Sequence, residues 1–164
     1  MQSTNHFISL NLRPFLHDFL RKTSAMFELV AFTASVQAYA DTVLDYLDPN
    51  KEYFKYRLYR HNCVFTQGLF IKDLRVLGNR RPEDIIIVDN APHSFGFQLD
   101  NGVPIKTWTG DYSDDQLYSV VKYLERLNSA KDVRAVNRKT FGLQDFCDRH
   151  LDNLVQYRKV SKTK

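Results

Sequence analysis

The chain has 164 residues, 43% of them hydrophobic and 26% charged, with a net charge of +4. This balance is typical of one globular domain and excludes disordered, collagen-like and coiled-coil proteins. No apolar run approaches the roughly 20 residues of a membrane span, and residues 1–7 lack the apolar core of a signal peptide. Two cysteines, Cys63 and Cys147, favour a reducing compartment over a disulfide framework.

The positive charge is concentrated at the C-terminal end. Residues 129–164 contain nine Lys or Arg and four Asp residues, whereas residues 1–128 are nearly neutral overall. We interpret the segment as a solvated basic extension. The less favoured alternative is an arm that docks to an acidic partner or to nucleic acid. Of these two partners, we do not expect direct binding to nucleic acid.

The first third of the chain alternates between helical and strand patterns. Pro14 suits the first turn of a helix, and an apolar stripe follows it. The apolar run 27–34 predicts a short buried strand. Ser35 is the expected N-cap of a second helix, which continues to Leu47.

The middle of the chain predicts a β-hairpin and a buried strand. Two β-rich runs, 56–65 and 69–71, flank Thr66-Gln67-Gly68 and indicate the hairpin. The run Ile85–Val88 is typical of a parallel strand covered on both faces.

The C-terminal part predicts one strand and two helices. Residues 104–108 form a further strand candidate. Ser113 and Gln116 predict a capping box at the start of a helix that reaches Leu127. An amphipathic pattern predicts a last helix over 141–157.

Strands that alternate with helices predict an open α/β sheet. Ligands bind such sheets at the carboxyl ends of the strands, where Thr33 and Asp89-Asn90 are expected. Asp89 and Asn90 offer oxygen ligands of the kind that Mg²⁺ prefers, and the alternative is a simple turn.

Three further residue assignments each have a plain structural alternative. Thr33 could contact a phosphate at a helix N-terminus or cap the backbone locally. Lys72 could neutralise a phosphate as a point charge, and Arg60 could bind one with its guanidinium fork. Each cation could equally be a solvated surface residue.

Several segments, in this order and spacing, resemble one family. They are Arg13-Pro14, Phe27–Ser35, Tyr39-Ala40-Asp41, Tyr56–Phe65, Lys72-Asp73-Leu74, Leu77-Gly78, Ile86–Pro92, Asn101–Ile105, Trp108 and Asp132-Val133-Arg134. Together they resemble the small C-terminal-domain phosphatases, which include the Dullard-type enzymes of the haloacid dehalogenase superfamily.

The resemblance implies a haloacid-dehalogenase-like (Rossmannoid) open parallel sheet with a β-hairpin insertion. The phosphatase-like domain is expected to cover residues 1–136, and residues 137–164 are expected to form a basic, partly helical extension.

The resemblance also implies a Mg²⁺-dependent protein serine/threonine phosphatase that works through a phospho-aspartyl intermediate. Thr33, Lys72 and Asp89 would then be catalytic, with Thr33, Lys72 and Arg60 on the substrate phosphate and Asn90 and Asp89 at the metal. Substrates would be phosphoproteins such as the C-terminal tail of RNA polymerase II, and a nuclear or cytoplasmic location would follow.

One feature departs from the family pattern. The family carries its nucleophile in an Asp-x-Asp-x-Thr motif on a central strand upstream of Arg-Pro, and residues 1–12 contain no acidic residue. We therefore expect the central nucleophile strand to be missing and this chain to be inactive alone. The alternative function is a non-catalytic phosphoprotein-binding or scaffold member of the same fold.

Overall fold

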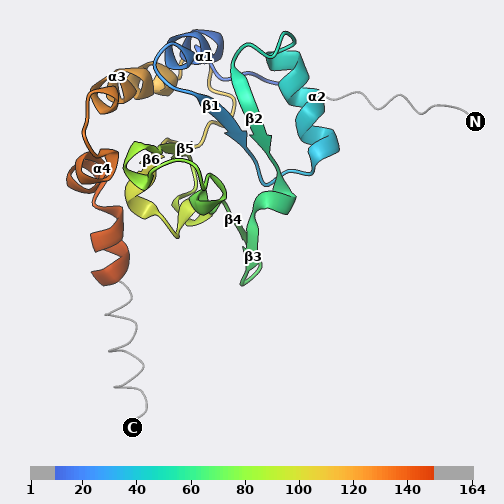
Figure 1. Ribbon diagram of the computed structural model, residues 1–164. Coiled ribbons are helices and arrows are strands. Elements are labelled where there is room, and N and C mark those ends of the chain that lie inside the picture. Colours follow the sequence, from blue (N-terminus) through green and yellow to red (C-terminus); the bar gives the residue numbers. More distant parts are fainter. Residues whose placement is uncertain (1–9, 150–164) are drawn as a thin grey trace, which may run out of the picture.

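The computed structural model describes residues 10–149, and Figure 1 shows the arrangement of their helices and strands. The helices are α1 (Leu16–Ser24), α2 (Gln37–Leu47), α3 (Gln116–Asn128) and α4 (Val133–Phe141). The strands are β1 (Leu29–Phe32), β2 (Phe54–Leu58), β3 (Val64–Thr66), β4 (Leu69–Ile71), β5 (Ile87–Asp89) and β6 (Gly102–Pro104). Within this part of the chain, no helix combines the length and apolar character needed to cross a bilayer.

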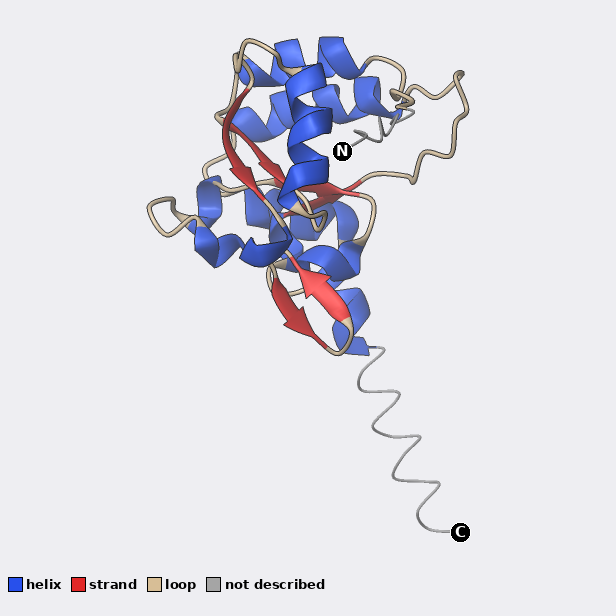
Figure 2. Cartoon of the chain, turned by 90° about the vertical axis from the view of Figure 1, so that its right-hand side faces the viewer, coloured by secondary structure: helices blue, strands red, loops and turns tan. Residues whose placement is uncertain are grey.

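The strands form three separate pairs. β1 pairs with β2 and β5 pairs with β6, both in parallel, whereas β3 and β4 form an antiparallel hairpin. The hairpin projects away from the body of the domain, at the bottom of both views (Figures 1 and 2). The expected α/β architecture with a hairpin insertion is confirmed, and no strand among residues 10–149 links β1 to β5.

The main core lies between the β5–β6 pair and helices α3 and α4. α3 presents one apolar face at helical spacing, and Leu124 and Leu127 of this face pack with Val103 of β6 and Val133 of α4. A second cluster surrounds Phe95, whose side chain is completely buried. This half of the domain therefore holds most of the buried apolar side chains.

The hairpin prediction was correct for its tip and wrong for its first strand. The run 56–65 is divided, because β2 ends at Leu58 and pairs with β1, and the short 3-10 helix Arg60–Asn62 separates it from β3. Thr66 pairs with Leu69, so the turn consists of Gln67 and Gly68 alone. Both have positive φ, at 50° and 79°, as a two-residue hairpin turn of right-handed twist requires.

Both predicted helix caps were wrong. Val36, not Ser35, precedes α2, and Asp115, not Ser113, precedes α3; neither side chain caps its helix. Ser113 instead donates from its backbone N–H and its hydroxyl to Asp111 Oδ1, at 2.9 and 2.7 Å. The Asp111 carboxylate thus binds the Ser113 hydroxyl, which the capping pattern assigns to the start of α3.

The last predicted elements are shifted along the chain. Residues 102–104, not 104–108, form β6, because its register with β5 starts at Gly102 opposite Ile87. α4 continues through the expected domain boundary after residue 136, so that boundary remains a prediction. The expected helix 141–157 is helical over 143–149 in the described part, and the rest lies outside the described residues.

Candidate functional site

Two parallel strands end close to the candidate residues, as the sequence predicts. Thr33 directly follows β1, and its backbone N–H donates to Leu58 O at 2.9 Å, which continues the pairing with β2. The Thr33 hydroxyl accepts a hydrogen bond from Ser35 N–H at 3.1 Å. This local turn fixes the hydroxyl just ahead of α2, a helix of 11 residues whose first N–H groups are free to bind an anion.

Lys72 and Asp89 form a largely buried ion pair. Lys72 Nζ bonds to Asp89 Oδ2, and the side chains are 14% and 8% exposed. Lys72 N–H donates to Ser94 O at 2.6 Å, which fixes the end of β4 against the Phe95 region. Asp89 ends β5, and its other oxygen, Oδ1, accepts a hydrogen bond from Ala91 N–H at 2.8 Å. Lys72 and Asp89 are 17 positions apart in the sequence, and their pairing places the Lys72 ammonium group at the carboxyl end of β5.

Arg60 connects this region to the end of β1. Its Nε donates to Ala34 O at 2.7 Å, and its backbone N–H donates to Ser35 O at 3.0 Å. The guanidinium carbon lies 5.0 Å from the centre of the Phe70 ring. One side of the guanidinium is therefore anchored on the Thr-Ala-Ser turn, and the residue itself is exposed.

Cys63, which the sequence did not identify as part of a site, lies among these residues. Its Sγ is 3.9 Å from Thr33 O and 3.8 Å from Tyr59 O. Burial raises the pKa of the Cys63 thiol, and the positive charges of Lys72 and Arg60 partly offset that rise. Cys63 therefore lies against the backbone of Thr33, and only the spatial arrangement reveals this.

A network behind the site holds β2 to α2. The Tyr59 hydroxyl donates to Asp41 Oδ1 at 2.6 Å, and Arg57 Nη1 pairs with the same oxygen at 3.0 Å and with Asp45 at 2.7 Å. The Tyr59 hydrogen bond lowers the pKa of Asp41 and raises that of Tyr59. These contacts fix the segment from which Arg60 extends.

Asn90 lies at the same strand end with its side chain turned toward another partner. Its Nδ2 donates to Thr107 Oγ1 at 3.0 Å, which leaves Oδ1 available as an acceptor. Among the described residues, no group of three or more His, Cys, Asp or Glu side chains could hold a metal ion. Asp89 and Asn90 fit Mg²⁺ as two oxygen donors of a six-ligand set, since this ion retains waters and binds substrate phosphate.

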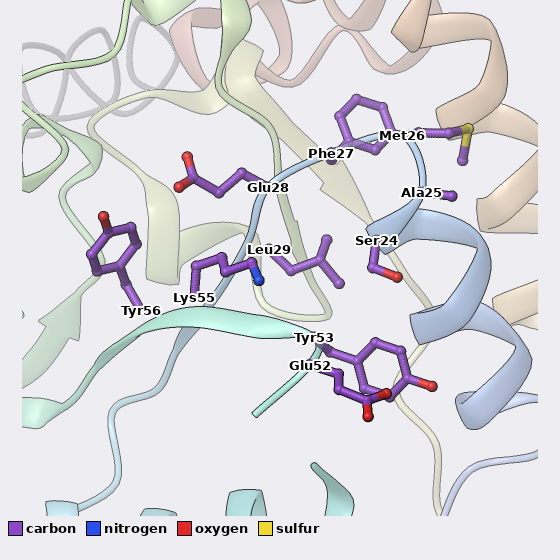
Figure 3. A pocket seen from close by; sticks show the side chains of 10 residues that line it. All are labelled: Ser24, Ala25, Met26, Phe27, Glu28, Leu29, Glu52, Tyr53, Lys55 and Tyr56. Atoms are coloured by element: carbon purple, nitrogen blue, oxygen red, sulfur yellow. The ribbon is translucent and has the colours of Figure 1, made fainter. Parts of the chain in front are cut away.

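A surface hollow lies at the opposite end of the same strand pair. Figure 3 shows it where α1 leads into β1 and where β2 begins, and its lining includes Glu28, Glu52, Lys55 and Tyr56. It is formed by the amino ends of β1 and β2, whereas Thr33 and Arg60 follow their carboxyl ends. It is therefore separate from the candidate site.

The ends of β1 and β5 thus carry the polar and cationic side chains of an α/β domain. Comparison with known proteins gives the family: residues 1–134 match the family model described as NLI interacting factor-like phosphatase. The chain is 45% identical over 141 residues to CTD small phosphatase-like protein 2 of Dictyostelium discoideum, covering 86% of this chain and 24% of that protein. It is 41% identical over 133 residues to the human carboxy-terminal domain RNA polymerase II polypeptide A small phosphatase 2, covering 81% and 48%.

A solved structure shares the fold. The fission yeast RNA polymerase II CTD phosphatase Fcp1, bound to beryllium fluoride, superposes with a TM-score of 0.53 at 21% identity, over 82% of this chain and 40% of that one. The chain belongs to the NLI interacting factor-like phosphatase family. It spans between a quarter and a half of the length of these two curated relatives.

Proposed function

We propose that this chain supplies the phosphate-binding part of a protein serine/threonine phosphatase. The observation that carries the proposal is the placement of two cations at neighbouring strand ends: Arg60 is anchored on the turn that follows β1, beside Thr33, and Lys72 pairs with Asp89 at the end of β5. Fixed positive groups around a transferring phosphoryl group stabilise its transition state without reorganisation, and this effect is usually the largest catalytic contribution.

Each residue has a definite role in the proposal. The Thr33 hydroxyl and the first N–H groups of α2 hold two phosphate oxygens, and Arg60 uses the guanidinium nitrogens that Ala34 does not engage. Lys72 balances the charge of the phosphate and is itself held in place by Asp89. A Mg²⁺ ion bound by Asp89 and Asn90 would neutralise further negative charge on the phosphoryl group.

None of the residues given a role above supplies the nucleophile that attacks the phosphate. In the family chemistry an aspartate attacks phosphorus, the serine oxygen leaves with a proton, and water then cleaves the aspartyl phosphate. Asp89 is not the attacking group in this proposal, because it lies at the end of β5, at the metal position, and is paired with Lys72. We propose that turnover requires an aspartate-bearing strand between β1 and β5, and that this chain alone binds substrate without hydrolysing it.

The substrates in the proposal are phosphoproteins. Relatives are named for the C-terminal domain of RNA polymerase II, which makes its phosphorylated repeats the first substrate to test and a nuclear or cytoplasmic location the first to examine. A non-catalytic phosphoprotein-binding or scaffold role on the same fold is the second candidate, favoured by the pairing of Asp89, the acidic residue at the end of β5, with Lys72.

A binding experiment tests the phosphate site. A fluorescent phosphoserine peptide is titrated with the full chain and with Lys72→Ala, Arg60→Gln and Thr33→Val. We expect each variant to weaken binding about tenfold or more, as for the loss of a charge-assisted hydrogen bond. Lys55→Ala, at the far end of β2, is the matched control and should bind like the wild type.

Two outcomes would overturn the proposal. One is a wild-type chain that binds phosphorylated and unphosphorylated peptides equally. The other is Arg60→Gln and Thr33→Val variants that keep full affinity while their circular dichroism spectra show a native fold. Phosphate release, measured with and without an added peptide carrying an Asp-x-Asp-x-Thr strand, then separates the enzyme from the binding module.

A further inference from the structure

The hairpin has two chemically distinct faces. Its register pairs Val64 with Ile71, Phe65 with Phe70 and Thr66 with Leu69. Because side chains alternate along a strand and cross-strand partners share a face, Phe65 and Phe70 lie on one face and the other four residues lie on the opposite one. The Phe65 and Phe70 rings are 4.8 Å apart.

The aromatic face is directed to the same side as the phosphate site. Lys72 is the first residue after β4 and lies two positions from Phe70 along the chain. Ile71, between them, points the other way and is buried. Lys72 reaches Asp89, and Phe70 lies under the Arg60 guanidinium. The aromatic pair thus adjoins Arg60 directly, and β4 leads from Phe70 to Lys72.

Core packing does not account for the aromatic pair. Phe65 is 63% exposed, and neither Phe65 nor Phe70 belongs to the two buried clusters. An exposed aromatic side chain that continues a charged binding site is the arrangement found at recognition surfaces, where a buried ring contributes a large share of the affinity.

We propose that Phe65 and Phe70 form a docking platform for an apolar side chain of the phosphorylated peptide. This inference rests on the proposed function, and it assigns a recognition role to the hairpin. The occupant is an extended peptide with its phosphate on Lys72 and Arg60 and with a leucine-like or aromatic side chain on the Phe65 ring.

The spacing follows from strand geometry. Two residues of extended chain separate Lys72 from Phe70, which corresponds to about 7 Å. The Phe65 ring lies a further 4.8 Å away across the hairpin. An extended peptide advances about 3.3 Å per residue. The apolar residue of the substrate is therefore expected two to four positions from the phosphoserine.

The test uses a peptide scan and a matched pair of hairpin variants. Nine-residue alanine-based peptides with a central phosphoserine carry a single leucine at each other position in turn, and their binding to the full chain is measured by fluorescence polarisation. Phe65→Ser removes the exposed ring of the platform. Leu69→Ser, an exposed apolar residue on the opposite hairpin face, is the control.

We expect leucine at one or more of the positions two to four residues from the phosphoserine to raise affinity about five- to tenfold, as burial of a leucine face does. The gain should disappear in Phe65→Ser and persist in Leu69→Ser. Equal gains in both variants, or no position-dependent gain in the wild type, would overturn the platform.

Two further readouts separate the alternatives. If Lys72→Ala and Arg60→Gln bind every peptide like the wild type, the phosphate site and the platform that rests on it both fail. If both variants weaken every peptide and leucine has no effect, only the platform fails. If Phe65→Ser instead lowers the mass of the free chain in sedimentation, the aromatic face joins two copies of the chain and the peptide platform is rejected.

Discussion

The two parallel strand pairs differ sharply in how they are packed. β5 and β6 lie against α3, α4 and the Phe95 cluster, so that Val103 and Ile87 are buried. β1 is equally apolar in sequence, yet all four of its residues remain half-buried, and α2 beside it buries only Ala40. Similar strand sequences therefore have very different environments.

This difference means that the proposed binding site draws its residues from a well-packed half and a less well-packed half of the domain. Lys72 and Asp89 belong to the well-packed half, whereas Thr33 and Arg60 belong to the half held mainly by side-chain hydrogen bonds. Local stability follows the number of buried apolar contacts, so we expect the β1–β2 half to open more readily. A phosphate bound between the halves would stabilise both.

The largest expected effect lies in the β5–β6 half. A Cβ atom at Gly102 would lie 2.0 Å from a ring carbon of the completely buried Phe95. We expect Gly102→Ala to lower the free energy of unfolding by about 3 kcal/mol, because overpacking a close-packed core forces backbone shifts. Urea unfolding measures the loss.

Gly78→Ala is the matched control. A Cβ at Gly78 has only one neighbour within 4 Å, at an ordinary contact distance of 3.8 Å. Its stability should stay close to that of the wild type. A Gly102→Ala protein as stable as this control would contradict the tight packing of the β5–β6 half.

The next effect concerns the β1–β2 half. Asp48 is 1% exposed, and its carboxylate accepts hydrogen bonds from the N–H groups of Glu52, Tyr53 and Phe54 at 2.7, 3.0 and 2.9 Å. Burial raises the pKa of Asp48, but these three donors outweigh it and hold the pKa below its ordinary value. We expect Asp48→Ala to destabilise the domain by about 2 kcal/mol, because three part-buried N–H groups lose their partner.

Hydrogen exchange locates that loss. The amides of residues 52–58 should exchange faster in Asp48→Ala, and those of residues 87–89 should change less. Asp45→Ala, which removes a carboxylate that is 59% exposed, is the control and should change little. Uniform acceleration across both strand pairs would show that the two halves do not differ in local stability.

A smaller effect depends on pH. The Arg75 guanidinium, with further hydrogen bonds from Arg75 N–H and Gln98, lowers the pKa of Asp73 from 3.8 to about 2. The folded state therefore favours ionised Asp73, so this stabilisation is complete above pH 3.8 and is lost as the pH falls toward 2. After solvent screening at the exposed Arg75, it amounts to about 1–2 kcal/mol.

Asp73→Asn provides the comparison. At pH 6 the variant should be less stable than the wild type by this amount, and at pH 3 the difference should shrink by about half. Urea unfolding at the two pH values measures both. A stability difference that is independent of pH would show that Asp73 acts through shape and not through its charge.

The smallest effect concerns an ion pair that connects the halves. Arg80, in the loop before β5, pairs with Glu28, which precedes β1, and both side chains are well exposed, at 43% and 38%. Exposed pairs of this kind contribute little in physiological salt. We expect Glu28→Gln to leave the thermal unfolding midpoint unchanged in 0.15 M salt, within about 1 °C; a larger drop would mean that surface charges hold the halves together.

The sequence predicted the strand-end residues because their logic is local. An apolar run followed by Thr33, or by Asp89-Asn90, places polar groups at the carboxyl end of a parallel strand wherever the sheet forms. In the structure Asp89 forms an ion pair with Lys72, and the two residues can therefore belong to one site. The grouping of Thr33 with Lys72 depended on the family resemblance, since 39 positions separate them.

Other features depend on contacts that no local pattern reveals. Gly102 and Pro104 are typical of a turn, yet they form β6, because Gly102 is the residue that fits against the Phe95 ring. The anchoring of Arg60 on Ala34 and the position of Cys63 beside Thr33 follow from the division of run 56–65 between two sheets. Pairing with strands distant in the sequence, and not the intrinsic β-propensity of the residues, therefore determines where β2 and β6 form.

One measurement tests most directly whether the two halves bind a single phosphate. It is a double-mutant cycle for phosphoserine-peptide affinity with Thr33→Val from the β1–β2 half and Lys72→Ala from the β5–β6 half, followed by NMR titration into the millimolar range. Residues that contact one group are energetically coupled, and we expect a coupling energy of about 1 kcal/mol or more. Losses that add to within about 0.3 kcal/mol would show two independent sites and contradict the account.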